Sequence, residues 1–570
     1  MAKDTNSTFA DLVVFGTIYT AENENDGLAE AFAVKDGKYI YVGDRAGAAQ
    51  FVEEGKTEVI DRTGEGLIIP GCTEGHSHYF DGTGLNTQLP GSGCNYGKVL
   101  EVLKEKVEKE GIRQFVSFGW NIYEIDEKRK AGFNFAEEIE SVAPGIPAVL
   151  IDGSGHAALC NTTALRMAGI LDDPHVRGGK VELDKDGKPN GFLGDQAAMY
   201  AVDKVISKPL NEEQYKNACL YGMNRLLALG YTNAFDAFTN MYDPTGLFKA
   251  LKKMDDAGEL KLNVAGSYNI KSYDADIYRS KVDEIVDIAK NYSSPHFNPG
   301  YVKLFTDGVV ESGTGWIFQE YKNPDEGKEH GNIIWTKDEV TAIAKYANSK
   351  GLVLHTHTYG DAACNTVIDA YIASNKANNG MFRNCLAHVR NILPEDIARA
   401  GENKIPIAEN LIWHTDYDDS DPSQLKLKQT MILSHVPEDL YYSGYPMKSL
   451  FDKGVIVSSS TDAPAAETIV GSIMNVLEVC VTGIAPHDTA QPLAPEELLT
   501  VRQGLQALTI NGAWQLGLEQ ERGSVKVGKY ADFVVLDKNI LDYEGEQLRT
   551  IGDTRILNTY FEGEKVYSAQ

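Results

Sequence analysis

The sequence has little positive charge and few cysteines for its length. Only 54 of the 570 residues are Lys or Arg, against 82 Asp or Glu, which gives a formal net charge of −28. A surface this acidic repels the phosphates of nucleic acids and the anionic headgroups of membranes, so neither partner is expected. The seven cysteines are odd in number and form no CxxC pair, which argues against a disulfide framework or a structural zinc module.

Long apolar segments are also missing. No apolar run approaches the roughly 20 residues that span a bilayer. The first ten residues are polar and lack the basic-then-apolar order of a secretory signal. Hydrophobic residues make up 42% and charged residues 24% of the chain, which excludes wholesale disorder. We therefore expect a soluble, cytoplasmic protein.

The two ends of the chain share a pattern of short predicted strands. Near the N-terminus, apolar runs flank the turn Asp36-Gly37, which is typical of a β-hairpin. Near the C-terminus, the run Ala531–Leu536 and the turn Glu562-Gly563 repeat this pattern. Neither end alone has enough strands to cover both faces of a sheet. We predict one small β-sandwich built from residues 1–69 and 515–570; the alternative is two unrelated β-rich caps.

Between the two ends, short apolar runs alternate with amphipathic stretches. This alternation is typical of βα units on a parallel sheet. The length of 70–514 fits a (β/α)8 TIM barrel with additions. The segment 119–206 is predicted to contain an insertion, because its Gly- and Asp-rich part 177–194 suggests a hairpin over the barrel mouth. The apolar runs expected to form strands are Leu67–Ile69, Ala148–Ile151, Val302–Phe305, Leu352–Leu354 and Val455–Ser458.

Histidine and aspartate residues follow several of these runs. His76 and His78 come after the first run, and residues two apart in an extended backbone point to the same side. His357 and His388 end two later runs, and Asp462 follows another. A single strand-end histidine is more often structural. In a barrel, however, the carboxyl ends of all strands open on the face where active sites are built, so these side chains are expected to converge.

A lysine interrupts an otherwise apolar predicted strand. Lys303 lies within the run Val302–Phe305. A lysine in that place is unfavourable unless it is paired, lies at a strand end or is chemically altered. One alternative is an unmodified lysine paired with Asp307 or Glu311.

Taken together, these motifs resemble the amidohydrolase superfamily, and specifically the amidohydrolase 3 (YtcJ-like) branch of metal-dependent hydrolases. The resemblance runs from about residue 10 to residue 567, with the motifs in the expected order. The matching segments are Pro70-Gly71 before His76-Ser77-His78, Gly155-His156-Ala157-Ala158, 302–308, 357–363, His388 with 394–397, 460–464 and 523–532.

The resemblance implies a TIM barrel with a terminal β-sandwich and a centre of two divalent cations. Zinc is expected, with manganese or iron as alternatives. Lys303 would carry a carbamate that bridges both cations. Asp462 would also act as the general base that takes a proton from water and passes it to the leaving nitrogen. The implied ligands are His76, His78, Lys303, His357, His388 and Asp462.

Further residues near the motifs are candidates for substrate contacts. His156 is a predicted catalytic or substrate contact that would stabilise an oxyanion; the alternative is a histidine that stabilises a loop. Trp120, Trp316 and Tyr359 could wall an apolar pocket, although aromatic side chains at such positions more often serve packing. His355 alternates with His357 and is a reserve ligand.

Three positions depart from the pattern of the family. Glu74 stands where the family usually has Asp, 311–316 replaces a common Ser-Arg-Thr-Ala, and Asp195 replaces a frequent Glu. The difference at Glu74 concerns the residues behind the metal ligands, and the other two indicate a substrate pocket unlike that of typical members. The histidines read as unrelated to catalysis are His175, His296, His330, His414, His435 and His487.

The function expected from these residues is hydrolysis of a C–N bond in a small molecule by metal-activated water, in an amide, N-acyl, N-formyl or cyclic amide. One alternative is a mononuclear deaminase, but the segments after His357 and His388 offer no glutamate as proton shuttle. Another is a non-catalytic barrel scaffold, although such proteins lose ligands and this chain keeps all six. By family habit we expect a homo-oligomer, with a dimer favoured.

Overall fold

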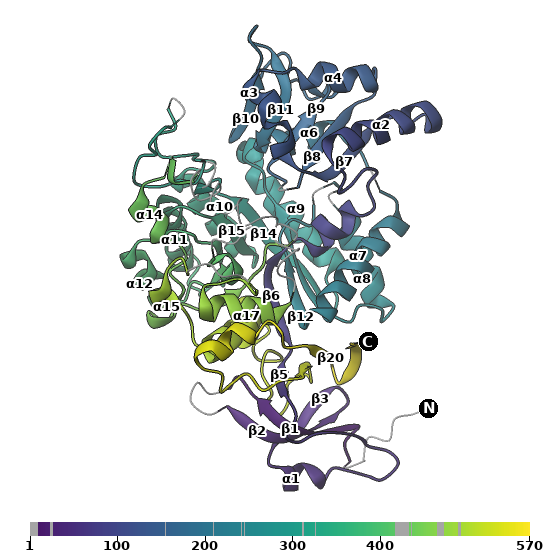
Figure 1. Ribbon diagram of the computed structural model, residues 1–570, viewed down its shortest axis with the longest axis vertical. Helices are drawn as coiled ribbons and strands as arrows, with labels where there is room; N and C mark the ends of the chain where they lie inside the picture. Colours follow the sequence, from purple (N-terminus) through teal and green to yellow (C-terminus); the bar gives the residue numbers. More distant parts are fainter. Residues whose placement is uncertain are drawn as a thin grey trace.

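The computed structural model describes most of the chain in three sheets. The described residues are 9–22, 27–153, 155–208, 210–240, 242–243, 245–310, 313–324, 327–415, 432–434, 436–463, 472–487 and 492–569. The expectations for Glu311, His435 and Pro464 concern residues outside these ranges. Along the longest axis, a sheet from the chain ends lies at one end, a barrel lies in the middle, and a third sheet lies at the other end (Figure 1).

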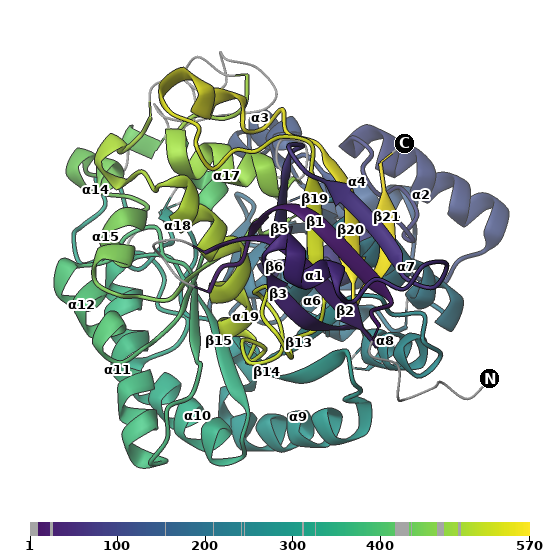
Figure 2. The ribbon, with the colours of Figure 1, turned by 90° about the horizontal axis from the view of Figure 1, so that it is seen from below.

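The first sheet combines strands from both ends of the chain, side by side (Figure 2). Strand β5 pairs antiparallel with β19, and Pro70 lies opposite Phe533. The rings of Phe32 and Phe533 are 5.0 Å apart although their strands are not neighbours, so the sheet folds over a shared core. The sandwich predicted from both termini is thereby confirmed as one folded sheet. Its order is β21 (Glu564–Ser568), β20 (Ile556–Phe561), β19 (Phe533–Leu536), β5 (Leu67–Pro70), β1 (Leu12–Tyr19), β2 (Leu28–Lys35) and β3 (Lys38–Gly43), with β4 (Glu58–Arg62) paired to β1.

The middle sheet is a nearly closed barrel of eight strands, and all its neighbouring pairs are parallel. This confirms the predicted TIM barrel. The strands are β6 (Cys72–Ser77), β12 (Tyr231–Asp236), β13 (Asn263–Asn269), β14 (Phe297–Phe305), β15 (Val353–Thr358), β16 (Cys385–His388), β17 (Ile407–Glu409) and β18 (Val457–Ser459). The outer helices include α7 (Glu212–Ala228), α8 (Gly246–Asp256), α9 (Tyr278–Tyr292), α10 (Lys337–Ser349), α11 (Asp361–Ala377), α12 (Pro394–Glu402), α15 (Met447–Asp452) and α17 (Ile473–Thr482).

The helix α10 shows how local sequence sets these outer elements. Thr336 accepts a hydrogen bond from the N–H of Glu339, and the Glu339 side chain accepts one from the N–H of Thr336. This capping box satisfies amide groups that have no partner within the helix. The helix then buries Val340, Ile343 and Ala347 on one face, which fixes its side toward the barrel.

The seam of the barrel lies between its first strand, β6, and its last strand, β18. The N–H of Asp462 donates to the carbonyl of His76 at 2.9 Å, just beyond the end of β18. The Glu74 carboxyl group accepts hydrogen bonds from the N–H groups of Thr461 at 2.9 Å and His76 at 3.2 Å. The backbone contacts that close the barrel therefore involve two residues of the predicted metal motifs.

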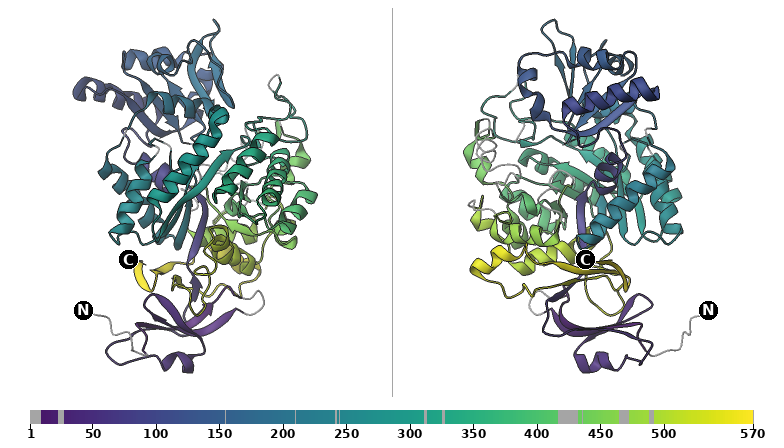
Figure 3. Two further views of the ribbon diagram at one scale, coloured as in Figure 1. Left: turned by 180° about the vertical axis from the view of Figure 1, so that it is seen from behind. Right: turned by 45° about the vertical axis from the view of Figure 1, so that its right-hand side comes forward.

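The third sheet has five strands and lies at the end of the barrel opposite the terminal sheet (Figure 3). Helices that pack against it include α2 (Tyr96–Glu110), α4 (Phe135–Val142), α5 (Thr162–Met167) and α6 (Gln196–Val205). The sheet overlaps the predicted insertion 119–206, whose limits, like the other domain boundaries, stay a prediction. Its order is β10 (Gly179–Leu183), β11 (Pro189–Asp195), β9 (Ala157–Cys160), β8 (Ala148–Asp152) and β7 (Phe115–Trp120).

Two apolar runs expected in the barrel lie elsewhere, and that expectation was wrong. Leu67–Ile69 belongs to the terminal sheet and Ala148–Ile151 to the five-stranded sheet. An apolar run records burial but not the sheet in which a strand pairs. The first barrel strand is Cys72–Ser77, whose mostly polar residues do not give an apolar run. Among the described residues, no helix has both the length and the hydrophobicity needed to cross a membrane.

Candidate metal centre

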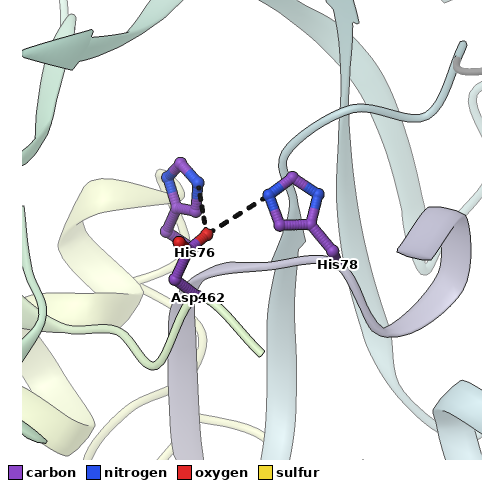
Figure 4. A group of neighbouring side chains, drawn as sticks. All are labelled: His76, His78 and Asp462. Carbon is purple, nitrogen blue, oxygen red and sulfur yellow. Dashed lines mark ion pairs between the residues drawn. The ribbon is translucent and has the colours of Figure 1, made fainter. Parts of the chain in front are cut away.

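Three of the predicted ligands form a tight group where the barrel closes. His76 is on β6, His78 follows this strand, and Asp462 follows β18. The Nε2 atoms of His76 and His78 are each 3.3 Å from Oδ1 of Asp462 (Figure 4). One ligand atom from each of the three residues lies within 4.8 Å of the others. Two imidazoles and a carboxylate at this spacing are a donor set that suits a divalent cation.

The other three predicted ligands adjoin this group. Nζ of Lys303 is 3.4 Å from Nε2 of His76. The ring centroid of His388 is 4.5 Å from that of His76 and 4.6 Å from that of His357. The structure therefore brings all six predicted ligands to one end of the barrel, and His76, His78 and Asp462 form the group whose donor atoms all lie within 4.8 Å of one another.

Four of the six predicted ligands have protonation states that suit a bound cation. Burial lowers the pKa of His76 and His388 well below its ordinary value and that of His357 to about 3, so these imidazoles are neutral. Burial raises the pKa of Asp462, but the bond from His78 and nearby positive charge outweigh burial and bring it to about 2. Neutral imidazoles and an ionised carboxylate are the forms that bind divalent metals.

His78 and Lys303 show what charge this place accepts. Burial lowers the pKa of His78, but Asp81 and Asp462 outweigh burial and raise it to about 10. Two carboxylates therefore stabilise positive charge beside the His78 ring. Burial lowers the pKa of Lys303 to about 7, so its amine loses its proton easily.

A second set of contacts orients the imidazoles. Nδ1 of His76 is 2.7 Å from Nε2 of His355, which stacks on Phe235 with ring centroids 4.1 Å apart. The reserve ligand His355 thus lies behind His76 as its hydrogen-bond partner. Nδ1 of His388 is 2.7 Å from Oδ1 of Asn410. Partners of this kind fix which ring nitrogen faces a metal.

Three residues of this region have a left-handed backbone without being glycine. The φ angles are 79° at His388, 55° at Asp462 and 48° at Asp195. This conformation costs about 1–3 kcal/mol for such residues and persists where the surrounding structure holds it. His388 and Asp462 line one cavity, and Asp195 contacts His156, which lines the same cavity. This supports a functional role for the cavity.

The cavity begins at five of the six predicted ligands, which are His76, His78, His357, His388 and Asp462. His156 and Tyr359 line it, whereas Trp120 and Trp316 are not among its lining residues. Trp120 is fully buried in the core of the five-stranded sheet, with its ring 5.8 Å from that of Tyr96. The backbone N–H of Trp316 donates a hydrogen bond to the Asp307 carboxylate at 2.9 Å. The structure thus brings only two of the four predicted substrate contacts to the cavity.

His156 is held in the cavity wall by Asp195. Nδ1 of His156 is 3.0 Å from Oδ1 of Asp195, and its ring centroid is 6.4 Å from that of His357. Burial lowers the pKa of His156, but the bond to Asp195 outweighs burial and raises the value. A histidine in this state donates hydrogen bonds toward a substrate oxygen.

Several residues that shape the centre were not found from the sequence. Asn410 holds His388, and Trp413 stacks on the same ring with centroids 5.6 Å apart. No motif near either residue marks it. Asp81 contacts Nδ1 of His78 at 3.1 Å, and an acid three residues after the histidine is a signal that could have identified it.

The barrel and its group of imidazoles, lysine and aspartate define a metal-dependent hydrolase. The chain belongs to the amidohydrolase family, because the model of the Amidohydrolase family matches residues 58–567.

Known proteins resemble the chain over nearly its whole length. It is 27% identical to the N-substituted formamide deformylase of Arthrobacter pascens, over 97% of each chain. It is 26% identical to the protein LONG AFTER FAR-RED 3 of Arabidopsis thaliana, over 98% of this chain and 92% of the other. An uncharacterized metal-dependent hydrolase of Pyrococcus horikoshii has the same fold, with a TM-score of 0.69, 20% identity, and coverage of 93% of this chain and 98% of that one.

Proposed function

We propose that the protein hydrolyses the C–N bond of a small amide, and that N-substituted formamides are the first class to test. The observation that carries this proposal is the convergence of six potential ligands at one end of the barrel, where five of them line one cavity. The activity named for the Arthrobacter pascens relative, deformylation of N-substituted formamides, supports the choice of formamides.

His76, His78 and Asp462 would hold one divalent cation, and His357 and His388 a second, with zinc favoured over manganese or iron. When bound, such cations lower the pKa of water and polarise a carbonyl group. We propose that Lys303 is carbamylated: its neutral amine attacks CO2, loses one proton and becomes an anionic oxygen ligand. Complete burial and a pKa of about 7 support this step.

The side chains around the substrate have separate tasks in the proposed reaction. Asp462 is ionised, so it accepts a proton from the water that attacks the carbonyl carbon. The C–N bond then breaks, and Asp462 returns the proton to the leaving nitrogen. His156, oriented by Asp195, donates a hydrogen bond to the carbonyl oxygen as negative charge develops there.

The test combines metal analysis with a substrate panel. The purified protein is assayed with N-formyl and N-acetyl amines before and after chelation and after addition of zinc, manganese or iron. We expect carboxylate release that disappears with the chelator and returns with metal. Less than about half an equivalent of metal per chain in metal-replete buffer would instead favour a scaffold. Ammonia release from an amino-substituted heterocycle, without amide hydrolysis, would favour a deaminase.

A second experiment tests the carbamate. Lys303→Met removes the amine and keeps an apolar side chain of similar length. We expect it to lose bound metal and activity, and we expect wild-type protein loaded with metal under CO2-free conditions to regain activity when bicarbonate is added. If bicarbonate does not change the activity of the wild type, whether it is added before, during or after metal loading, carbamylation is contradicted.

The predicted location and oligomeric state remain part of the proposal. All seven cysteines are free, and six of them are buried, which agrees with a reducing compartment such as the cytoplasm. Light scattering on the purified chain tests the expected dimer.

A further inference from the structure

The cavity beyond the candidate metal centre is mostly apolar. Phe118 and Ile151 line it from the five-stranded sheet, and Met199 and Val202 line it from α6. Phe305, at the end of β14, completes this wall beside His156, with ring centroids 6.5 Å apart. A hydrocarbon group gains free energy by leaving water for such a wall, whereas a polar group loses hydration there.

An ion pair of Lys271 and Asp203 also lines this cavity. Nζ of Lys271 lies 2.5 and 2.7 Å from the two carboxylate oxygens of Asp203. The hydroxyl of Tyr273 also donates to Asp203. Lys271 is only 6% exposed, and its Nζ lies 5.7 Å from the ring centroid of Phe238.

Lys271 and Asp203 also line a second, more polar cavity, so the pair forms a wall that the two cavities share. Each member neutralises the other. A substrate carboxylate placed beside the pair would meet the charge of Asp203, and a substrate ammonium would meet the charge of Lys271. A neutral group meets neither penalty, so the pair disfavours substrates of both charge signs.

Resting on the proposed amide hydrolysis, we propose that the cavity selects amides whose nitrogen carries a bulky, apolar and uncharged substituent. The apolar wall binds the substituent, and the Lys271–Asp203 pair is the element that rejects charged ones. The substrate class is therefore an N-formyl or N-acyl derivative of an arylalkyl or branched alkyl amine, rather than an N-acyl amino acid.

Three formamides test this selection. N-formyl-2-phenylethylamine and N-formylphenylalanine differ only by a carboxylate, and N-formylethylamine lacks the ring. We expect the ring to raise kcat/KM about 30-fold or more. We expect the carboxylate to lower kcat/KM about 100-fold. Equal or faster turnover of N-formylphenylalanine would overturn the proposal.

Two variants should move this preference in opposite directions. Asp203→Asn leaves the charge of Lys271 without its partner, so we expect kcat/KM for N-formylphenylalanine to rise about tenfold relative to the neutral substrate. Lys271→Met leaves the carboxylate of Asp203, so we expect the relative value to fall further. Asp274→Asn removes the same charge from the second cavity alone and should leave the ratio unchanged. A general structural effect would instead shift both variants in the same direction, which would contradict the role of the pair.

Binding separates this inference from the proposed reaction. The Asp462→Asn variant, loaded with metal, is titrated with the same three formamides by calorimetry. Binding of N-formyl-2-phenylethylamine at least about tenfold tighter than N-formylphenylalanine supports the inference even if the wild type hydrolyses neither compound. In that case the proposed function fails and the selectivity of the cavity stands. The reverse order of affinities overturns the inference whatever the turnover.

Discussion

The molecule contains two clusters of histidine and acidic side chains that differ in chemistry. The first is the candidate metal centre. The second, here called the interface cluster, consists of Asp255, His296, Arg522, Asp532 and Glu562 and lies between the barrel and the terminal sheet. His296 contacts Asp255 through Nδ1 at 2.7 Å and Glu562 through Nε2 at 3.1 Å, and Arg522 contacts Asp532 at 2.6 Å.

The clusters differ in whether their charges are balanced. In the interface cluster, the bond to Glu562 raises the pKa of His296, although burial lowers it. Burial raises the pKa of Glu562, but His296 and Arg522 outweigh burial and bring it to about 2. At the candidate metal centre, burial and neighbouring imidazoles lower the pKa of His76 and His388. Residue type alone therefore does not identify a functional site. The candidate metal centre differs from the interface cluster because it borders a cavity and because its neutral imidazoles and ionised carboxylate could bind a cation.

The largest effect should come from Asp462→Asn, which keeps the size of the side chain and tolerates its left-handed backbone. We expect kcat to fall about 10³-fold, because the proton acceptor is lost. We expect metal content to fall much less, since the amide oxygen remains beside His76 and His78. Activity and metal measured on the same sample test this, and an equal loss of both would reduce Asp462 to a ligand.

The second effect concerns the interface cluster. Arg522 is 3% exposed, and Arg522→Met leaves Asp532 buried without its partner. We expect the free energy of unfolding in urea to fall by about 3 kcal/mol. Because the cluster is separate from the cavity, kcat at a temperature where the variant stays folded should match that of the wild type. A large loss of kcat in the folded variant would contradict the conclusion that the interface cluster serves stability and not catalysis.

Asp195→Asn tests the acid that contacts His156 in the cavity wall. The variant keeps a hydrogen-bond acceptor for His156 but removes the charge that raises its pKa. We expect kcat to fall about tenfold. Urea unfolding should change little, because asparagine has almost the same size and shape as aspartate and Asp195 already holds the same positive φ of 48°. If stability falls while kcat stays constant, the pair of His156 and Asp195 has a structural role like that of the interface cluster.

The smallest effect is the pH dependence of the interface cluster. The raised pKa of His296 gives stability that is complete below its ordinary value of 6.5 and is lost as pH rises through the raised value. The lowered pKa of Glu562 gives stability that is complete above 4.5 and is lost as pH falls toward about 2. The stability difference between wild type and His296→Gln should thus be largest between pH 4.5 and 6.5, at about 1 kcal/mol or less. Urea midpoints across pH would show it; a difference that grows above pH 8 would contradict the sign.

The sequence pattern is enough to identify functional residues that lie directly at or after the end of a predicted strand. His76, His78 and Asp462 follow strands that converge on one face of the barrel, so strand-end position and residue type are sufficient to bring them together. Trp120 also stands beside a motif, yet it belongs to the core of the five-stranded sheet. Position beside a motif does not specify which way a side chain faces.

Contacts between distant segments are beyond such patterns. Lys271 and Asp203 meet across 68 residues, and neither stands in a recognised motif. Strand β6 is polar in residue type, so its place as the first barrel strand follows from pairing with β12 and not from hydrophobicity. The terminal sheet could be predicted from the sequence, because each end of the chain has too few strands for a sheet and the other end supplies the rest.

The seam of the barrel gives the metal centre a mechanical consequence. The first and last barrel strands meet where the backbone N–H of Asp462 donates a hydrogen bond to the carbonyl of His76. A cation bound by both side chains would therefore link these two strands and stabilise the closed barrel. Because the ion would bind the closed barrel and not the unfolded chain, tighter ion binding would raise the free energy of unfolding. A chain stripped of metal would open there first and uncover two strand edges, which favours aggregation between molecules.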